Sequence, residues 1–205
     1  MILGSTLLYK DSPAKQADVY KSIGIAYSVL GDYQKAIENM QKATQLAPAN
    51  VTYVSHLAAL YDSAGRQQEA LATYRDALKL APNNGVVLNN LAYLITQTGG
   101  DLDEALSLAQ HARQQLPKAN ETPETLDTIG FIYLKKNLTA SAIDVFRELV
   151  NEVPNNPEFH YHYAMALAQN GDKDGALQEL NTALQCHPNG SEEKQIKELI
   201  RSLSL

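Results

Sequence analysis

The apolar positions of the chain recur at the spacing of an α-helix, in five segments separated by glycine and proline. The first segment places Tyr20, Ile23, Gly24 and Tyr27 at i, i+3, i+4 and i+7, which is one face of an amphipathic helix. A small residue follows the large one, so we expect two helix backbones to approach closely there. The same order returns in four later segments: Val54/Leu57/Ala58/Tyr61, Leu88/Leu91/Ala92/Ile95, Leu126/Ile129/Gly130/Tyr133 and His160/Tyr163/Ala164/Leu167.

A second helix is predicted after each of these segments. Glycine stands before it at Gly31, Gly65, Gly99/Gly100 and Gly171, and glycine readily adopts the left-handed conformation that ends a helix. Asn137 takes this place in the fourth segment, and asparagine tolerates the same conformation. Each second helix carries its own apolar stripe: Ala36/Met40/Ala43, Ala70/Tyr74/Ala77, Ala105/Ala109/Ala112, Ala142/Phe146/Leu149 and Ala176/Leu180/Ala183.

Prolines end the second helices at a regular interval, because proline cannot continue a helix interior. They are spaced 34, 35, 37 and 34 residues apart, at Pro48, Pro82, Pro117, Pro154 and Pro188. The repeating unit is therefore a hairpin of two helices that cannot bury its apolar stripe alone, so neighbouring hairpins must stack.

This pattern resembles the tetratricopeptide repeat. The resemblance implies an all-α fold, a right-handed α-α superhelix (solenoid) of stacked helix-turn-helix hairpins. The sequences of segments such as Asn89–Leu94 and Gly99–Ala105 are similar to those of bacterial members of the family, including members associated with exopolysaccharide and envelope export. Five units match the pattern within residues 17–190: 17–50, 51–84, 85–119, 123–156 and 157–190.

The two ends of the chain differ from the repeats. Residues 191–205 predict a helix that caps the stack, with Ser191 as its N-cap and an apolar stripe of Ile196, Leu199, Ile200 and Leu203. The same stripe could instead form a dimer contact. Residues 1–16 are a lead-in or the remnant of a preceding repeat, because Thr6–Pro13 resembles the end of a second helix. An excised piece of a longer protein and a short native lead-in both stay open.

Charge and cysteine content exclude several classes of protein. Lysine and arginine number 17 against 23 aspartates and glutamates, which gives a net charge of −6. Nucleic-acid binders usually carry surplus positive charge, because neutralising phosphates drives their affinity, so no nucleic-acid partner is expected. The single cysteine excludes an intrachain disulfide and a cysteine-based zinc site. No apolar run approaches the ~18 residues of a membrane span, so no membrane insertion is expected.

The sequence offers no constellation for catalysis. His160 and His162 lie two residues apart and point to different sides of one helix, so they cannot share a metal ion. His160 is predicted to be a part-buried structural residue, and no histidine has a carboxylate at ligand spacing in the sequence. Asp101 and its acidic neighbours lack the full calcium loop. We therefore predict no catalytic residue, no metal site and no cofactor.

The resemblance implies that the first helix of each unit lines a concave surface. Tyr93, Phe131, Tyr161 and Met165 would form an aromatic and apolar strip there, suited to docking a partner. The alternative is that these side chains brace adjacent repeats. The charged residues on this surface are mostly acidic, and the excess of acidic residues is largest in units four and five. The predicted groove residues are Lys21, Ile25, Asp62, Asn89, Tyr93, Asp127, Phe131, Glu158, Tyr161 and Met165.

The sequence thus predicts a non-catalytic protein–protein interaction scaffold, which binds a protein or peptide segment in its groove. The partner would be apolar with neutral or basic flanks. One alternative is a regulatory or docking segment of a larger enzyme or of an envelope or secretion assembly. Another is a module that self-assembles through its N-terminal end, so both a monomer and a weak homo-oligomer stay open. The compartment is open too: cytoplasm by default, or periplasm if an upstream signal or lipid anchor was removed.

Overall fold

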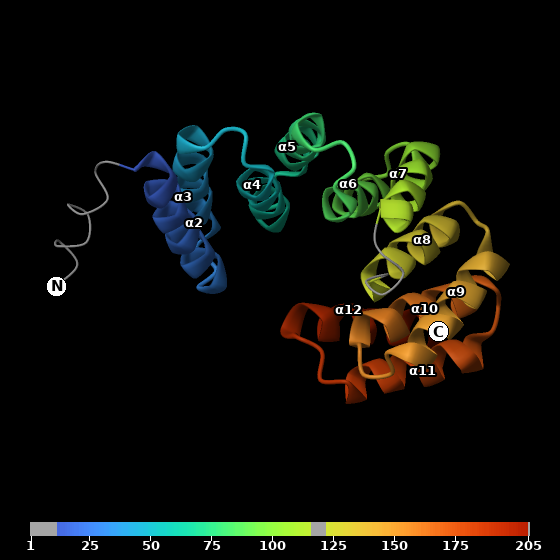
Figure 1. Cartoon of the computed structure of the whole chain (residues 1–205). Coiled ribbons are helices and arrows are strands. Elements are labelled where there is room, and N and C mark those ends of the chain that lie inside the picture. The colour runs from blue at the N-terminus through green and yellow to red at the C-terminus, as the bar shows by residue number, and fades with distance from the viewer. Residues whose placement is uncertain (1–11, 116–121, 205) are drawn as a thin grey trace. The chain divides into compact units, whose positions relative to one another are not determined.

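The described part of the chain is entirely helical outside its turns. The computed structural model describes residues 12–115 and 122–204, and no strand occurs among them. The helices follow one another as shown in Figure 1. Their bounds are α2 Pro13–Val29, α3 Tyr33–Leu46, α4 Val51–Ser63, α5 Gln67–Leu80, α6 Gly85–Gln97, α7 Leu102–Gln115, α8 Pro123–Lys135, α9 Thr139–Glu152, α10 Pro157–Gln169, α11 Lys173–Gln185 and α12 Gly190–Ser204.

The turn inside each hairpin depends on one residue with a positive φ angle. The four glycines at these turns have φ between 70° and 84°, and Asn137 has a φ of 59°. L-residues with a bulky side chain avoid this conformation, so the prediction from glycine spacing and from Asn137 is confirmed. The turn glycines are Gly31, Gly65, Gly99 and Gly171.

The second helices end shortly before the predicted prolines. Helix α3 ends at Leu46, two residues before Pro48, and α9 ends at Glu152, two residues before Pro154. Pro117 lies outside the described residues. Asparagine opens several of the first helices. For example, Oδ1 of Asn50 accepts hydrogen bonds from the backbone N–H groups at positions 52 and 53, which satisfies two donors that the helix leaves unpaired.

The chain divides into two compact units, Met1–Leu94 and Ile95–Leu205. In the N-terminal unit, α2 packs on α3, α3 on α4 and α4 on α5. The predicted close approach of backbones is confirmed at Gly24, where an added Cβ atom would lie 3.1 Å from the carbonyl oxygen of Ala36. Helix α2 begins at Pro13, so this proline is the first residue of a helix. Residues 6–11, which were interpreted as part of a preceding helix, lie outside the described residues.

The C-terminal unit repeats the same packing with larger side chains. Helix α8 packs on α7 and α9, and α10 packs on α9 and α11. Its core contains Phe146, Leu149, Phe159 and Leu180, all at most 2% exposed. Gly130 is required here, because an added Cβ atom would lie 2.7 Å from Cε1 of Phe146. Both units are therefore built of helical hairpins packed side by side, and the fold is an all-α solenoid.

Helix α12 covers the last hairpin, as its apolar stripe predicts. It packs on α10 and α11, and Ile196 is 1% exposed. The prediction that Ser191 is the N-cap is wrong, because Asn189 performs this role. Its Oδ1 accepts hydrogen bonds from the backbone N–H groups of Ser191 and Glu192, and its own N–H donates to Oε2 of Glu192. This reciprocal capping box satisfies more donors than a serine at position 191 could.

Candidate functional site

The N-terminal unit has an open cavity between its first helices. The cavity has a volume of about 180 Å³. Ile25, a predicted groove residue, is 42% exposed on its rim, and Met40 is fully buried at its back. Helices α2 and α4 supply the other side chains that line it: Ser28, Val29, His56, Ala59, Leu60 and Ser63.

Repeat spacing explains why these side chains meet. Ile25 and Ala59 are 34 residues apart, so they occupy the same register on α2 and α4. The sequence identified Ile25 but missed His56, Met40 and Leu60. Met40 and Leu60 follow the spacing of core residues, so only the packing of the helices shows that they also reach the cavity.

The polar groups near this cavity are paired or partly buried. Lys21 Nζ lies 3.6 Å from Oδ1 of Asp18, and the Tyr53 hydroxyl donates to the same oxygen at 2.7 Å. Burial lowers the pKa of His56, and the positive charge of Lys21 lowers it further. Burial also raises the pKa of Asp62. At neutral pH the cavity therefore presents apolar carbon, the side chains of Ser28 and Ser63, and a neutral imidazole ring.

In the C-terminal unit, the positions equivalent to Lys21 and His56 are Asp127 and His162, which form a buried ion pair. Asp127 and His162 are each 4% exposed. Nδ1 of His162 lies 2.8 Å from Oδ1 and 3.0 Å from Oδ2 of Asp127. Spacing in the sequence did not reveal this contact. The two residues are 35 positions apart, and only the stacking of α8 against α10 brings them together.

The Asp127–His162 pair is held by aromatic rings. Phe131 is 7% exposed and stacks on the imidazole of His162 with ring centroids 4.9 Å apart. The ring of Phe146 is tilted against the same imidazole, with ring centroids 5.9 Å apart. Asp127 and Phe131 were predicted to face the groove, but here they pack between α8 and α10. This burial favours the alternative interpretation, in which they brace adjacent repeats.

The charge on His162 follows from its surroundings. Burial lowers the pKa of His162, but the negative charge of Asp127, its hydrogen bond and the charge of Glu158 together raise the pKa above its ordinary value. Lys135 opposes this with a smaller effect. The carboxylate of Asp127 thus favours the protonated imidazole, whose Nδ1–H donates to the carboxylate in a charge-assisted hydrogen bond.

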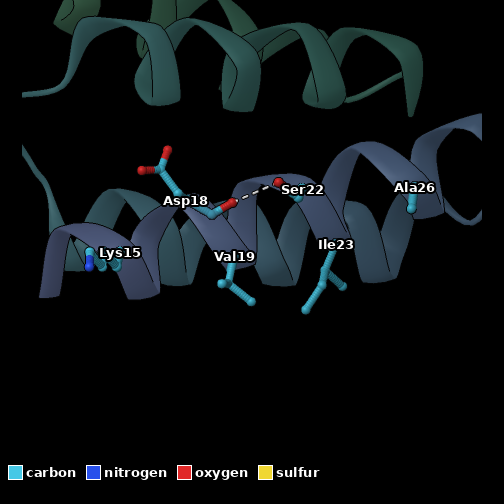
Figure 2. Close-up of a pocket in the computed structure, with 6 residues that line it drawn as sticks. All are labelled: Lys15, Asp18, Val19, Ser22, Ile23 and Ala26. Carbon is cyan, nitrogen blue, oxygen red and sulfur yellow. Dashed lines mark hydrogen bonds between the residues drawn. The ribbon is translucent and has the colours of Figure 1, made fainter. Parts of the chain in front are cut away.

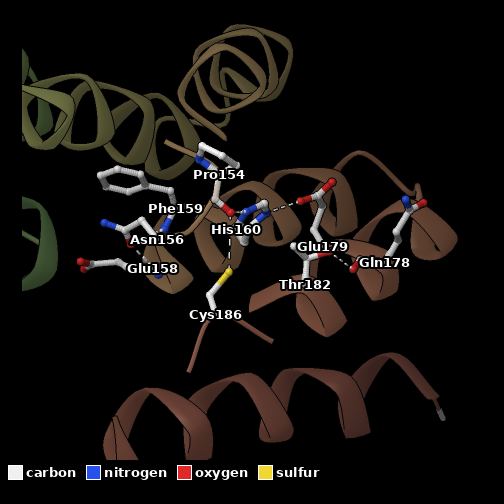
Figure 3. Close-up of polar contacts among 9 residues, drawn as sticks. All are labelled: Pro154, Asn156, Glu158, Phe159, His160, Gln178, Glu179, Thr182 and Cys186. Carbon is white, nitrogen blue, oxygen red and sulfur yellow. Dashed lines mark hydrogen bonds and ion pairs between the residues drawn. The ribbon is translucent and has the colours of Figure 1, made fainter. Parts of the chain in front are cut away.

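His160 is a structural residue, as the sequence predicts. Its Nδ1 lies 2.6 Å from Oε2 of Glu179, and its Nε2 donates to the carbonyl oxygen of Pro154 at 2.9 Å (Figure 3). The hydrogen bond to Glu179 raises the pKa of His160, against the opposing effect of burial. Both ring nitrogens are engaged, so His160 joins α10 to α11 and to the loop before α10.

Asp127, Glu158 and His162 also have the donor set of a metal site. Their ligand atoms lie within 4.8 Å of one another. However, Nδ1 of His162 already lies at hydrogen-bonding distance from both carboxylate oxygens of Asp127, at 2.8 Å and 3.0 Å. The hydrogen-bonded distances are those of an ion pair. The geometry therefore fits a structural pair better than a metal centre.

The remaining predicted groove residues differ in how accessible they are. Asn89 is 9% exposed, and its Oδ1 is a buried side-chain atom without a hydrogen-bond partner. Tyr93 is half-buried. On α10, Tyr161 and Met165 are half-buried and Glu158 is exposed. Burial raises the pKa of the Tyr161 hydroxyl, helped by the charge of Glu198 on α12. These α10 side chains remain reachable from solvent.

Within residues 12–115 and 122–204, none of the helices has the length and apolar character of a membrane span.

The comparisons with known proteins agree with this fold. None of the curated proteins matches the chain. The chain is similar to the solved structure of TTC0263, a thermophilic TPR protein of Thermus thermophilus. The identity is 18%, the TM-score is 0.74, and 91% of this chain and 98% of that chain are covered.

Two further solved structures have the same fold at low identity. PilW, described as a widely conserved type IV pilus biogenesis factor, is 13% identical with a TM-score of 0.73, over 91% of this chain and 92% of that one. YrrB, described as a TPR protein with an unusual peptide-binding site, is 18% identical with a TM-score of 0.63, over 95% and 98%. The family profile described as tetratricopeptide repeat matches residues 14–187. The chain therefore belongs to the tetratricopeptide repeat family.

Proposed function

We propose that this protein is a non-catalytic scaffold that binds a peptide segment of a partner across the first helices of its hairpins. The tetratricopeptide repeat fold typically serves as a protein-interaction scaffold. The observation that carries the proposal is the open cavity between α2 and α4, with Ile25 and Val29 exposed on its rim. YrrB, which has the same fold, is described as having a peptide-binding site.

The chemistry of the cavity suggests the kind of segment that it binds. A volume of about 180 Å³ holds one large aliphatic or aromatic side chain, and such anchors supply most of the affinity at protein interfaces. Asp62, the sequence neighbour of the cavity-lining Ser63, favours a neutral or basic residue beside the anchor. In the C-terminal unit, the half-buried Tyr161 and Met165 and the exposed Glu158 offer a separate contact surface on α10.

A selected peptide and a matched pair of variants test this proposal. Peptides would be selected from a displayed random library against the full chain, and their Kd measured by fluorescence anisotropy. Ile25→Asp places a charge at the cavity rim and is expected to weaken binding at least tenfold. Leu80→Asp changes a comparably exposed apolar residue on the second helix α5, outside the cavity, and is expected to leave Kd unchanged. Equal binding by the Ile25→Asp variant and the wild type would overturn the cavity proposal.

A second candidate is a docking segment of a larger envelope assembly, within which the chain is a monomer or a weak homo-oligomer. It is supported by the likeness to PilW, which is described as a pilus biogenesis factor, although at 13% identity this likeness concerns the fold alone. The two candidates differ in the surface they use. An assembly component would keep its association when Ile25 is changed to Asp, whereas a groove binder would lose its peptide.

A further inference from the structure

The cavity between α2 and α4 has polar side chains at both ends of its length. On α4 its lining residues follow one helix face, with His56 first, Ala59 one turn later and Ser63 two turns later. On α2, Ser28 lies one turn beyond Ile25, which shares its register with Ala59. The first helices of stacked hairpins run in the same direction, so the two serines lie at one end and His56 lies at the other, with apolar residues between them.

These polar side chains are not used within the fold. Among residues 12–115 and 122–204, neither the ring nitrogens of His56 nor the hydroxyls of Ser28 and Ser63 take part in a hydrogen bond. Two other serines of the same helices differ, because Ser22 on α2 and Ser55 on α4 each donate to a backbone carbonyl oxygen of their own helix, at 2.8 Å (Figure 2) and 3.0 Å. This is a common arrangement for serine inside a helix. The polar groups at both ends of the cavity are therefore available to a ligand.

The end of the cavity at His56 favours a neutral polar group. Partial burial lowers the pKa of the imidazole, and the positive charge of Lys21 lowers it further, so the ring carries one donor and one acceptor nitrogen at neutral pH. His56 is still accessible at the surface, and a ligand can reach it. A cationic side chain would meet the charge of Lys21, whereas a carboxylate would lose its hydration against Met40 and Leu60.

The middle of the cavity favours an aromatic ring. Met40 is fully buried at its back and Leu60 is 6% exposed, and the thioether of a methionine makes favourable contacts with aromatic rings. At a rise of about 1.5 Å per residue, His56 and Ser63 lie roughly 10 Å apart along α4. This is close to the span of a tyrosine residue that makes one hydrogen bond at its hydroxyl and another at its backbone.

We propose that the cavity binds a tyrosine side chain of the partner, with the ring against Met40 and Leu60 and the phenol hydroxyl hydrogen-bonded to His56. This inference rests on the proposed function, the binding of a peptide segment in the same cavity. At the other end, the hydroxyls of Ser28 and Ser63 bind the backbone of the anchor residue. A leucine or phenylalanine would also fill the apolar middle, but it would cover His56 and leave the ring without a hydrogen-bond partner, which weakens binding. The cavity therefore discriminates between tyrosine and phenylalanine.

A matched pair of peptides tests this inference. Peptides whose binding to the full chain is weakened by Ile25→Asp are taken from the displayed random library, and the anchor is the position at which alanine weakens binding most. Tyrosine is expected there. Each peptide is then synthesised with tyrosine and with phenylalanine at the anchor, and both Kd values are measured by fluorescence anisotropy. Phenylalanine is expected to bind the wild type about fivefold more weakly, because one neutral hydrogen bond is lost.

Variants of His56 assign the hydrogen bond to this side chain. His56→Leu is expected to bind the two peptides equally, whereas His56→Gln keeps a donor and an acceptor and is expected to retain most of the preference for tyrosine. His111→Leu, on α7 and outside the cavity, is the matched control and should retain all of it.

The outcomes separate this inference from the proposed function. An anchor other than tyrosine, equal binding of the two peptides by the wild type, or an unchanged preference in His56→Leu would overturn the inference and leave the cavity as a peptide site. Failure to select any peptide whose binding depends on Ile25 would overturn the proposed function and this inference with it.

Discussion

His162 Nδ1 lies 2.8 Å from Asp127 Oδ1, although the two residues are 35 positions apart in the sequence. The same two registers in the N-terminal unit hold Lys21 and His56, where the positive charge of Lys21 lowers the pKa of the imidazole. One repeat spacing thus produces a buried ion pair between α8 and α10, and an unfavourable pairing between α2 and α4. The ion pair that joins the fourth and fifth hairpins has no counterpart at this register in the first two.

The Asp127–His162 pair should make stability depend on pH. The pKa of His162 is raised in the folded protein, so its contribution is fully present below the unfolded pKa of about 6.5 and is lost as pH rises through the folded pKa. Asp127→Asn removes the charge. We expect it to lower the free energy of unfolding by roughly 3–5 kcal/mol at pH 5.5, and by less at pH 9, as measured by urea denaturation followed by circular dichroism.

An exposed carboxylate provides the control for this pH experiment. Asp174 lies on the surface in the first turn of α11, so Asp174→Asn is expected to change stability by less than about 0.5 kcal/mol at both pH values. If the loss caused by Asp127→Asn were the same at pH 5.5 and pH 9, the imidazolium would not be the partner of Asp127.

Gly130→Ala should destabilise the C-terminal unit through a direct clash. The added methyl group would lie 2.7 Å from Cε1 of Phe146, which is fully buried and cannot move away. Overpacking of this kind costs about 1–3 kcal/mol. Gly190→Ala is the matched control, since no atom lies within 4 Å of its added Cβ. Thermal and chemical unfolding measure both variants, and Phe146→Leu in the Gly130→Ala background should recover part of the loss.

Asn137→Val tests the left-handed turn between α8 and α9. The φ angle of 59° is unfavourable for a β-branched residue, so we expect a loss of about 1–2 kcal/mol in unfolding free energy. Asn137→Gly removes the strain but also loses an exposed hydrogen bond from Gln169, 2.9 Å long, so its effect should be much smaller. Equal destabilisation by valine and glycine would show that the hydrogen bond matters and the backbone conformation does not.

Ile196→Ala should weaken the attachment of α12 to the last hairpin. Ile196 is 1% exposed, and truncating a buried isoleucine costs roughly 2–5 kcal/mol. Gln195→Ala changes the exposed neighbour and should stay within about 0.5 kcal/mol. The chain has one cysteine, the half-buried Cys186 just before α12, so faster reaction of its thiol with Ellman's reagent would report the loosened cap. An unchanged rate and unchanged stability would mean that α12 does not close the stack.

Local sequence rules predicted most of the fold. Glycine and asparagine at the hairpin turns, proline after the second helices, and a small residue beside a large one all act within a few residues of themselves. Gly24 and Gly130 were identified by this local pattern, and the structure brings the second helix of the same hairpin within contact distance of each. The N-cap of α12 was missed for a local reason too, since Asn189 and Ser191 are both good capping residues and the N-cap lies two residues earlier than predicted.

The candidate site was predicted less well, because burial there depends on the neighbouring hairpin. Ile25 and Phe131 occupy the same register of the repeat, yet Ile25 is exposed on the rim of a cavity and Phe131 is covered by His162. Different contacts with the next first helix produce the two outcomes. Ala59 and His56 line the cavity with Ile25, whereas the imidazole of His162 stacks on Phe131.

The sequence alone determined the helices, their turns and their repeat, because these depend on backbone conformation and on contacts within about four residues. Only the tertiary structure decided that Asp127 meets His162 and that a cavity opens beside Ile25. These features join side chains about 34 residues apart or involve another helix. Their free energy comes from desolvation and packing between helices, which no local pattern records.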